Sequence, residues 1–266
     1  LEIIANIRKS VLQMVHQAKS SHVGAAFSIV EILYVLYFKH MNIDPKTPAK
    51  ADRDRFILSK AHASAALYST LAHRGFFPLE YLMTYCINNG KLPGHLDKDA
   101  VPGVEISAGS LGHGLPIAVG MALADKKKNN GAKVYCIVGD GECNEGSIWE
   151  AAMLAASLKL DNLTVIIDYN KIQSFGNTNE IIDQSNIAER WSAFGFEAYE
   201  LLDGHDIQAL EKLFENKSEK PKAIIAHTTK GKGVSFMENK LAWHYKSPND
   251  EELKTAIEEL ECAKLL

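Results

Sequence analysis

Residues 133–173 read KVYCIVGDGECNEGSIWEAAMLAASLKLDNLTVIIDYNKIQ, and this stretch predicts the fold class. It contains an apolar strand, a Gly-Asp-Gly turn, a helix and a second apolar strand that ends at Asn170, in the order of a βαβ unit. A right-handed crossover returns the chain beside its first strand, so we expect the two strands to be parallel neighbours. Asp140 and Asn170 should then lie side by side at the carboxyl edge of the sheet, where α/β proteins bind ligands.

The two polar side chains at this edge suit a magnesium ion that is shared with a phosphate. The Asp140 carboxylate and the neutral Asn170 amide are hard oxygen donors of modest total charge, which suit Mg²⁺ better than zinc. The next helix begins near Gly146, and its positive N-terminal end favours a phosphate at the same place. A calcium loop of the EF-hand type is excluded, because its sixth position is Glu145 rather than glycine and its twelfth is Ala151.

The rest of the chain alternates between strand patterns and helical patterns. We expect further strands at 55–58, 196–201 and 222–229, and irregular loops at 91–114 and 170–186. Helices are expected before Gly75, in the C-terminal tail, and at 1–19, 27–40, 78–88, 115–128, 187–195 and 205–217, with a break at 20–28. This alternation predicts a single α/β domain over 1–266, with a mostly parallel central sheet and helices on both faces.

The composition, 46% hydrophobic and 23% charged, is typical of a globular protein. A formal net charge of −4 gives no reason to expect nucleic acid as a partner. No apolar run reaches the ~18 residues of a membrane span, and the N-terminus lacks the pattern of a signal peptide. Four cysteines without metal-type spacing indicate reduced thiols in a cytoplasmic protein. Because the sequence starts at Leu1 rather than methionine, we expect that a few residues precede it.

Four histidines lie in expected loops rather than on apolar faces. His22, His62 and His95 stand beside glycine or small residues, and His244 has aromatic neighbours. One such histidine is typical of a surface, but four that converge at strand ends could bind anions and transfer protons near neutral pH. We expect a second set to be surface or helix-end residues, namely His16, His40, His73 and His205.

Three further motifs carry little information alone. GSLGHG at 109–114 has the letters of a nucleotide-binding loop, but no clear strand precedes it and no Walker lysine follows it. KGKG at 230–233 is too short to be specific. Cys143 lies beside the Gly-Asp-Gly turn, but the sequence indicates no base that would activate it as a nucleophile.

Taken together, these motifs resemble a known family. The Gly-Asp-Gly turn with Asn170 downstream looks like the thiamine-diphosphate motif, in which an asparagine follows somewhat under thirty residues after GDG. The N-terminal diphosphate-binding domain of transketolase has motifs similar, in the same order, to SSHVGAA, SKAHASAALY, LPGHLD and ISAGSLGHGLPIAVGMALA. The resemblance covers nearly the whole chain and implies the thiamine-diphosphate-binding fold.

The resemblance also implies a metal and cofactor site. Mg²⁺ or Ca²⁺ would be held by Asp140, the Asn170 side chain and the Ile172 carbonyl, with the two phosphates of thiamine diphosphate completing the shell. Gly141 would offer its N–H to the diphosphate, and Glu145 would support the turn as a further carboxylate.

By the same resemblance, His62 and His244 would contact the diphosphate or the reacting centre. Gly109 and Leu111 would cradle the bend between the two rings of the cofactor. His22 and His95, together with His244, would bind sugar hydroxyls and transfer protons. In this family the cofactor carries a two-carbon ketol unit from a ketose to an aldose, while the protein supplies orientation and proton handling.

Two features depart from the family pattern. In the usual GPLGQG segment, Ser110 replaces proline and His113 replaces glutamine. The sequence ends at Leu266, whereas a full-length transketolase is more than twice as long and carries its pyrimidine-binding domain and sugar-phosphate residues in the missing part. The resemblance therefore implies the N-terminal subunit of a split transketolase, which joins a C-terminal subunit in an α₂β₂ heterotetramer that acts on sugar phosphates.

Other functions stay open at this point. The alternatives are the α subunit of a 2-oxo acid dehydrogenase, a deoxyxylulose-phosphate-synthase-like enzyme, a non-catalytic scaffold relative, and a metal-dependent enzyme without thiamine. The GSLGHG segment and the His95 loop favour transketolase over the dehydrogenase, and the retained Asp140 and Asn170 argue against a scaffold. The sequence specifies neither the donor nor the acceptor sugar.

Overall fold

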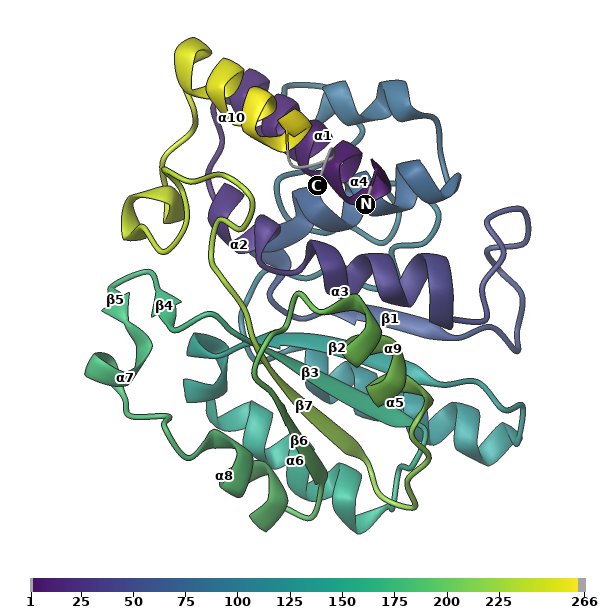
Figure 1. Ribbon diagram of the computed structural model, residues 1–266. Helices are drawn as coiled ribbons and strands as arrows, with labels where there is room; N and C mark the ends of the chain where they lie inside the picture. The colour runs from purple at the N-terminus through teal and green to yellow at the C-terminus, as the bar shows by residue number, and fades with distance from the viewer. Residues whose placement is uncertain (1, 263–266) are drawn as a thin grey trace.

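The central sheet is parallel and has the expected α/β arrangement. The structure, a computed structural model, describes residues 2–262 (Figure 1). Within this range the main sheet has five strands, all parallel, in the order β1 (Arg55–Leu58), β2 (Val134–Gly139), β3 (Leu163–Tyr169), β7 (Lys222–His227) and β6 (Glu197–Leu201). The predicted fold class is therefore confirmed.

Helices cover both faces of the sheet. One face packs against α5 (Gly114–Lys128), α6 (Gly146–Ser157) and α8 (Ile187–Ala193). The other packs against α2 (Val23–Phe27), α3 (Val30–Val35), α4 (Ser64–Arg74) and α9 (Ile207–Glu215), and a π-helical turn, η1 (Leu36–His40), continues α3. Alternate strand residues serve the two faces: in β1, Phe56 and Leu58 belong to one core cluster and Ile57 to the other. Strands buried on both faces read as continuous apolar runs, which is why the pattern was visible in the sequence.

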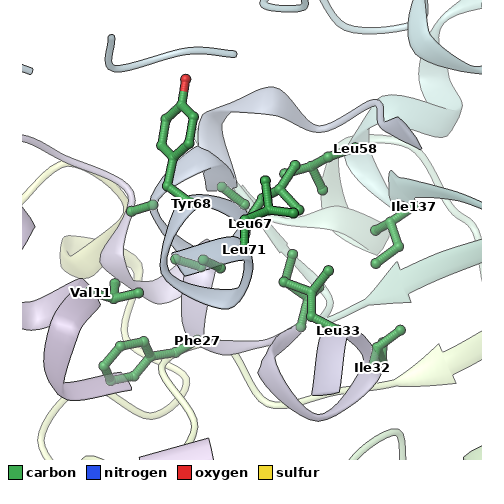
Figure 2. Packing of buried hydrophobic residues seen from close by; sticks show 14 of the residues in the cluster. Val11, Phe27, Ile32, Leu33, Leu58, Leu67, Tyr68, Leu71 and Ile137 are labelled. Atoms are coloured by element: carbon green, nitrogen blue, oxygen red, sulfur yellow. The ribbon is translucent and has the colours of Figure 1, made fainter. Parts of the chain in front are cut away.

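The larger core cluster fixes the loops that later carry His22 and His62. Leu67 and Leu71 of α4 lie with Leu33 of α3 against strand residues such as Leu58 and Ile137 (Figure 2). Burying each such side chain contributes about 1.5–3 kcal/mol. An outer pair of helices, α1 (Glu2–Ala18) and α10 (Asp250–Cys262), packs beside α4.

The βαβ unit of 133–173 forms as predicted. β2 and β3 pair in parallel, with Gly139 opposite Asp168. A short 3₁₀ turn, η4 (Gly141–Asn144), lies between β2 and α6. Asp140 and Asn170 directly follow the two neighbouring strands, so their predicted proximity is confirmed.

Two expected segments are shorter or more ordered than the pattern indicated. The break at 20–28 contains the short helix α2. The helix expected at 78–88 forms only a 3₁₀ turn, η3 (Leu79–Thr84), because Cys86 and Asn89 adopt φ angles of 51° and 59° that a right-handed helix does not allow.

The segment expected as a loop at 170–186 also contains ordered structure. Two-residue strands β4 (Ile172–Gln173) and β5 (Gly176–Asn177) form an antiparallel hairpin, and α7 (Thr178–Ile181) follows. The hairpin is anchored at its base, where Asp140 accepts hydrogen bonds from Lys171 N and from the Thr178 hydroxyl. These tertiary contacts determine the hairpin, and they leave no periodic signal in the sequence.

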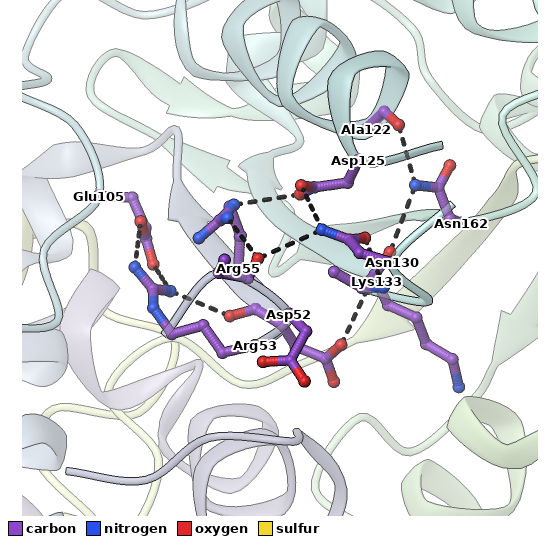
Figure 3. Close-up of polar contacts among 12 residues, drawn as sticks. Asp52, Arg53, Arg55, Glu105, Ala122, Asp125, Asn130, Lys133 and Asn162 are labelled. Carbon is purple, nitrogen blue, oxygen red and sulfur yellow. Dashed lines mark hydrogen bonds and ion pairs between the residues drawn. The ribbon is translucent and has the colours of Figure 1, made fainter. Parts of the chain in front are cut away.

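Polar contacts close the amino edge of the sheet (Figure 3). Arg55 Nε donates to Asp125 Oδ2 at 3.1 Å, and Asn130 Nδ2 donates to the other oxygen of the same carboxylate at 3.1 Å. Arg53 forms a salt bridge with Glu105 nearby. These contacts connect the loop before β1 to α5 and to the long loop at 91–114.

Two expectations from composition can be compared with the structure. All four cysteines are free thiols, with Cys136 and Cys143 buried and Cys86 and Cys262 exposed. In the described part of the chain, no helix has both the length and the apolar character needed to cross a bilayer.

Candidate active site

A cavity of about 340 Å³ lies at the carboxyl edge of the sheet. The loops after β1, β2, β3 and β7 each contribute a charged or amide side chain to its wall, namely Lys60, Asp140, Asn170 and Lys230. All site residues predicted from the sequence also line it: His22, His62, His95, Gly109, Leu111, Asp140, Gly141, Glu145, Asn170, Ile172 and His244. Their convergence is thus observed, whereas their individual roles stay predictions.

The Asp140 carboxylate is buried and bound to the backbone around the turn. Oδ1 accepts the Gly141 N–H at 2.7 Å, and Oδ2 accepts the Lys171 N–H at 2.7 Å and the Thr178 hydroxyl at 3.1 Å. Burial, together with the nearby Asp168 carboxylate, raises the pKa of Asp140 to about 6 in spite of these bonds. A cation at this carboxylate would therefore stabilise its ionised form.

The Asn170 amide is held in one orientation by a buried carboxylate. Its Nδ2 donates to Asp168 Oδ2 at 2.9 Å, and its Oδ1 accepts the Ile172 N–H at 3.1 Å. Asp168 also accepts hydrogen bonds from Lys60 and from the Ser28 hydroxyl. Burial alone would raise the pKa of Asp168, but the Lys60 ammonium and these hydrogen bonds lower it, so this carboxylate stays ionised.

The donor set fits a hard cation that takes further oxygens from a ligand. Asp140 supplies a carboxylate, Asn170 an amide oxygen and Ile172 a main-chain carbonyl beside them. Within residues 2–262, no group of three or more His, Cys, Asp or Glu side chains could hold a metal ion. A site with one carboxylate and neutral oxygens matches the way Mg²⁺ binds together with substrate phosphates.

The carboxylate that supports the turn is Glu142, which sequence reasoning missed. Its buried side chain accepts the Gly139 N–H at 3.0 Å and the Gly112 N–H at 2.9 Å, and it also binds the Ser59 hydroxyl. Glu142 thereby joins the Gly-Asp-Gly turn to the GSLGHG loop. Glu145 instead is exposed, stands at the N-terminal cap of α6 and lines the cavity. The support expected of Glu145 is thus provided by Glu142, and any other role of Glu145 stays a prediction.

The four loop histidines converge, as the sequence analysis anticipated. The ring centroid of His22 lies 5.2 Å from that of His62, 5.1 Å from that of His244 and 6.3 Å from that of His95. His62 belongs to the 3₁₀ turn η2 (Ala61–Ala63), and His244 ends the 3₁₀ turn η5 (Leu241–His244). These histidines come from four separate loops, so only the tertiary fold brings them together.

The histidine rings are held in their neutral form. Burial, and then the neighbouring His95 and Lys230, lower the pKa of His22 to about 4. Burial and Lys230 likewise lower the pKa of His244 to about 3, and burial lowers the pKa of His62 well below its ordinary value. A neutral imidazole can both accept and donate a hydrogen bond, which suits proton transfer to and from sugar oxygens.

Lys230 determines which nitrogen of His244 carries the proton. Lys230 Nζ lies 2.9 Å from His244 Nδ1 and donates to the Ile172 carbonyl at 2.8 Å. Because an ammonium group can only donate, Nδ1 of the neutral imidazole accepts and Nε2 carries the hydrogen. Burial and the nearby Lys60 lower the pKa of Lys230 to about 8.

Lys60 and Lys230 are the second pair of site residues that sequence reasoning missed. Their side chains are buried to about 1% exposure, and both line the cavity. Each stands in a quoted motif, SKAHASAALY or KGKG, but neither motif by itself distinguishes a buried lysine from one on the surface. Two ammonium groups on one cavity wall suit a diphosphate.

Glycine is required at two close approaches around the cavity. A side chain at Gly141 would place its Cβ 2.9 Å from Gln173 Cβ. Gly112 has a φ of +81°, and its Cβ would lie 2.4 Å from Ser147 Oγ. Ser110 and His113, the two departures from the family pattern, are exposed and stand outside the cavity lining.

Comparisons with known proteins agree with this geometry. Residues 1–263 match the family "Transketolase, thiamine diphosphate binding domain". One of the named subunits of the apulose-4-phosphate transketolase of Actinobacillus succinogenes is 45% identical, over 95% of this chain and 92% of that protein. The SqwG subunit of the 6-deoxy-6-sulfo-D-fructose transketolase of a Clostridium species is 43% identical, over 96% of this chain and 94% of that protein.

A solved transketolase structure shows the same fold in a longer chain. The transketolase of Campylobacter jejuni superposes with a TM-score of 0.90 at 36% identity, covering 98% of this chain and 43% of that one. The relatives of similar length are named as subunits, whereas the longer relative contains the corresponding part as one portion of its chain. This chain belongs to the transketolase family, of which it carries the thiamine-diphosphate-binding domain.

Proposed function

We propose that this chain is the N-terminal subunit of a two-subunit transketolase. The enzyme transfers a two-carbon ketol unit from a ketose that carries a phosphate or another acidic group to an aldose phosphate. The observation that carries the proposal is the cavity that joins an Asp140–Asn170 oxygen pair to four neutral histidines. The match over nearly the full length of two proteins named as transketolase subunits supports it.

Thiamine diphosphate with Mg²⁺ is the proposed cofactor, and Ca²⁺ is the alternative metal. When bound, the cofactor supplies the carbon centre that accepts the ketol unit and passes it on. The metal would be held by Asp140, the Asn170 amide oxygen and the Ile172 carbonyl. The Gly141 N–H and the ammonium groups of Lys60 and Lys230 offer donors and positive charge to the diphosphate.

The histidines and the GSLGHG loop would handle the rest of the cofactor and the sugar. Gly109 and Leu111 line the wall against which the cofactor rings would rest. His62 and His244 would contact the diphosphate or the reacting centre, and the Nε2–H of His244 is a ready donor. His22 and His95 would bind sugar hydroxyls and exchange protons with them.

The activity would require a C-terminal subunit that carries the pyrimidine-binding domain. We expect an α₂β₂ heterotetramer in the cytoplasm, in line with the four free thiols, and we treat residues 1–266 as one transketolase-like domain, which the family match over 1–263 supports. The names of two relatives as subunits support a divided enzyme.

The test is reconstitution from separately purified subunits. Ketol transfer from a ketose phosphate to an aldose phosphate would be measured with thiamine diphosphate and Mg²⁺ for the two separate subunits and for their mixture. We expect activity in the mixture only, and native mass spectrometry would report the subunit ratio. Clear transfer by this chain alone would refute the divided site. Oxidation of pyruvate with an electron acceptor, without ketol transfer, would favour a 2-oxo acid dehydrogenase instead.

A further inference from the structure

A buried chain of hydrogen bonds links the first helices to the loop that carries Lys230. Arg8 of α1 binds Glu31 of α3 twice, with Nη1 to Oε1 at 2.7 Å and Nη2 to Oε2 at 2.8 Å. Glu31 Oε2 lies 2.9 Å from His205 Nδ1, and the Thr229 N–H points to His205 Nε2 at 2.8 Å. The side chains of Arg8, Glu31 and His205 are at most 9% exposed. The sequence-based expectation that His205 is a surface residue is therefore wrong.

The two contacts of His205 define its proton positions. The Thr229 amide can only donate, so His205 Nε2 must be the bare nitrogen of the ring. Nδ1 then carries the hydrogen and donates it to the Glu31 carboxylate. A carboxylate that fixes the tautomer of a histidine in this way leaves the opposite nitrogen as a dedicated acceptor.

Glu31 remains ionised to hold this arrangement. Burial would raise the pKa of Glu31, but the Arg8 guanidinium and the hydrogen bond with His205 outweigh it and lower the pKa to about 2. A buried ion pair contributes little net stability on average, because both charges lose their hydration. The arrangement is better suited to fixing a geometry than to strengthening the fold.

The held amide belongs to the segment that enters the active-site cavity. Thr229 immediately precedes Lys230, whose Nζ reaches the Ile172 carbonyl and His244 Nδ1. The turn that carries His205 lies against the same segment, since Gly204 N donates to the His227 carbonyl at 2.7 Å. His205 itself is absent from the cavity wall, so it acts only through its neighbours.

We infer that His205 is a positioning residue for Lys230. Glu31 fixes the His205 ring in the tautomer with a bare Nε2, and Nε2 holds the Thr229 N–H so that the Lys230 ammonium is directed into the cavity. The inference rests on the proposed function only where it concerns the bound cofactor. The alternative is a structural role, in which the chain of bonds joins α1 and α3 to the sheet and the Thr229 contact is incidental.

Two substitutions at His205 separate these roles. In His205→Asn, the side-chain amide nitrogen replaces Nδ1 and still donates to Glu31, but the acceptor for Thr229 is lost. In His205→Gln, the side-chain oxygen takes the place of Nε2 and accepts from Thr229, whereas the bond to Glu31 is lost. The positioning role predicts that Asn is the more harmful change at the active site, and the structural role predicts that Gln is the more harmful change overall.

Two measurements are made on the wild-type chain and on both variants. The first is amide hydrogen exchange of the peptide that contains residues 228–231 in the purified chain. The second is the dissociation constant of thiamine diphosphate, with Mg²⁺, in the complex with the C-terminal subunit. Leaving a buried N–H without an acceptor is expected to speed exchange and weaken cofactor binding by about tenfold in His205→Asn, with changes of less than about threefold in His205→Gln.

Equal effects of the two variants, or the reverse order, would overturn the inference. Unchanged exchange at 228–231 in His205→Asn would do the same. If exchange follows the expected order but the wild-type complex binds no thiamine diphosphate, the positioning of Lys230 stands and the proposed cofactor fails. Urea unfolding of both variants shows whether a loss of binding merely reflects a loss of folded protein.

Discussion

The two edges of the central sheet each carry a cavity, and the larger one is at the edge without the predicted site residues. The amino-edge cavity has a volume of about 480 Å³ and the carboxyl-edge cavity about 340 Å³. At the amino edge, the charged groups are already paired: Lys126 binds Asp161 at 2.6 Å, and Lys222 Nζ donates to the carbonyls at the end of α9. Lysines at such helix ends satisfy carbonyls that have no partner within the helix.

At the carboxyl edge, the polar groups are not fully paired within the chain. The pKa of Asp140 is raised to about 6, and Gln173 Nε2 is buried without a hydrogen-bond partner. The pKa of Lys222 at the amino edge is also lowered, to about 8, by its burial, but three carbonyls bind its ammonium. The comparison teaches that unfinished polar pairing, rather than the size of a cavity, marks the functional edge.

The largest effect is expected from removing the carboxylate at the functional edge. Asp140→Asn should lower ketol transfer by the reconstituted enzyme by more than about a hundredfold, because losing a metal ligand costs more than losing a residue that supports one. The measurement is the transfer rate as a function of Mg²⁺ concentration. Asp161→Asn, at the amino-edge cavity, is the matched control and should leave the rate unchanged. If Asp140→Asn keeps near-normal activity, the assignment of the metal site is wrong.

A histidine at each edge provides the next comparison. His62→Ala should lower kcat/KM by about a hundredfold, which is the ordinary contribution of a proton-transfer group. His40 is bound to the Tyr135 hydroxyl at 2.8 Å on the other side of the sheet, so His40→Ala should lower the unfolding midpoint and spare kcat/KM. Steady-state kinetics and urea unfolding of both variants measure the two effects. Similar kinetic losses in both would show that the His62 effect is one of folding.

Local rules explain which parts of this comparison could be predicted from the sequence. The hand of the βαβ crossover alone places Asp140 beside Asn170, and strands buried on both faces have unmistakable apolar runs. The loop histidines were found because glycine and small residues around them are unusual for ordinary surface loops. In each case the signal lies within a few residues of the group concerned.

The residues that were missed depend on partners far along the chain. Lys60 is buried only because Asp168, 108 residues later, balances its charge. Glu142 and Glu145 occupy the same short turn, and the 3₁₀ turn η4 determines that Glu142 is the one directed inward to Gly112 and Gly139. No propensity distinguishes two glutamates three residues apart, so the tertiary structure was needed to assign them.

A moderate effect is expected on acid stability, and it arises at the functional edge. The unfolded chain takes up a proton at His22 near the ordinary pKa of 6.5, whereas burial, His95 and Lys230 lower the folded pKa to about 4. Between these values the unfolded state binds more protons, so stability is lost as the pH falls from about 6.5 towards 4 and is unaffected above it. His22→Asn should therefore show a smaller drop in urea midpoint between pH 7 and pH 4.5 than the wild type. The same change at exposed His113 is the control, and a drop equal to that of the wild type in His22→Asn would contradict the sign.

The smallest effect is expected at the amino edge and is the sharpest test of the comparison. The Lys126–Asp161 pair is about 40% exposed on one side and 47% on the other, so water screens it well. Lys126→Ala should change the free energy of unfolding by less than about 1 kcal/mol and leave ketol transfer and cofactor affinity unaltered. Urea unfolding and kinetics of the reconstituted enzyme measure both. A clear kinetic effect would mean that the amino-edge cavity communicates with the active site across the sheet, and the division of the molecule into a finished and an unfinished edge would then have to be abandoned.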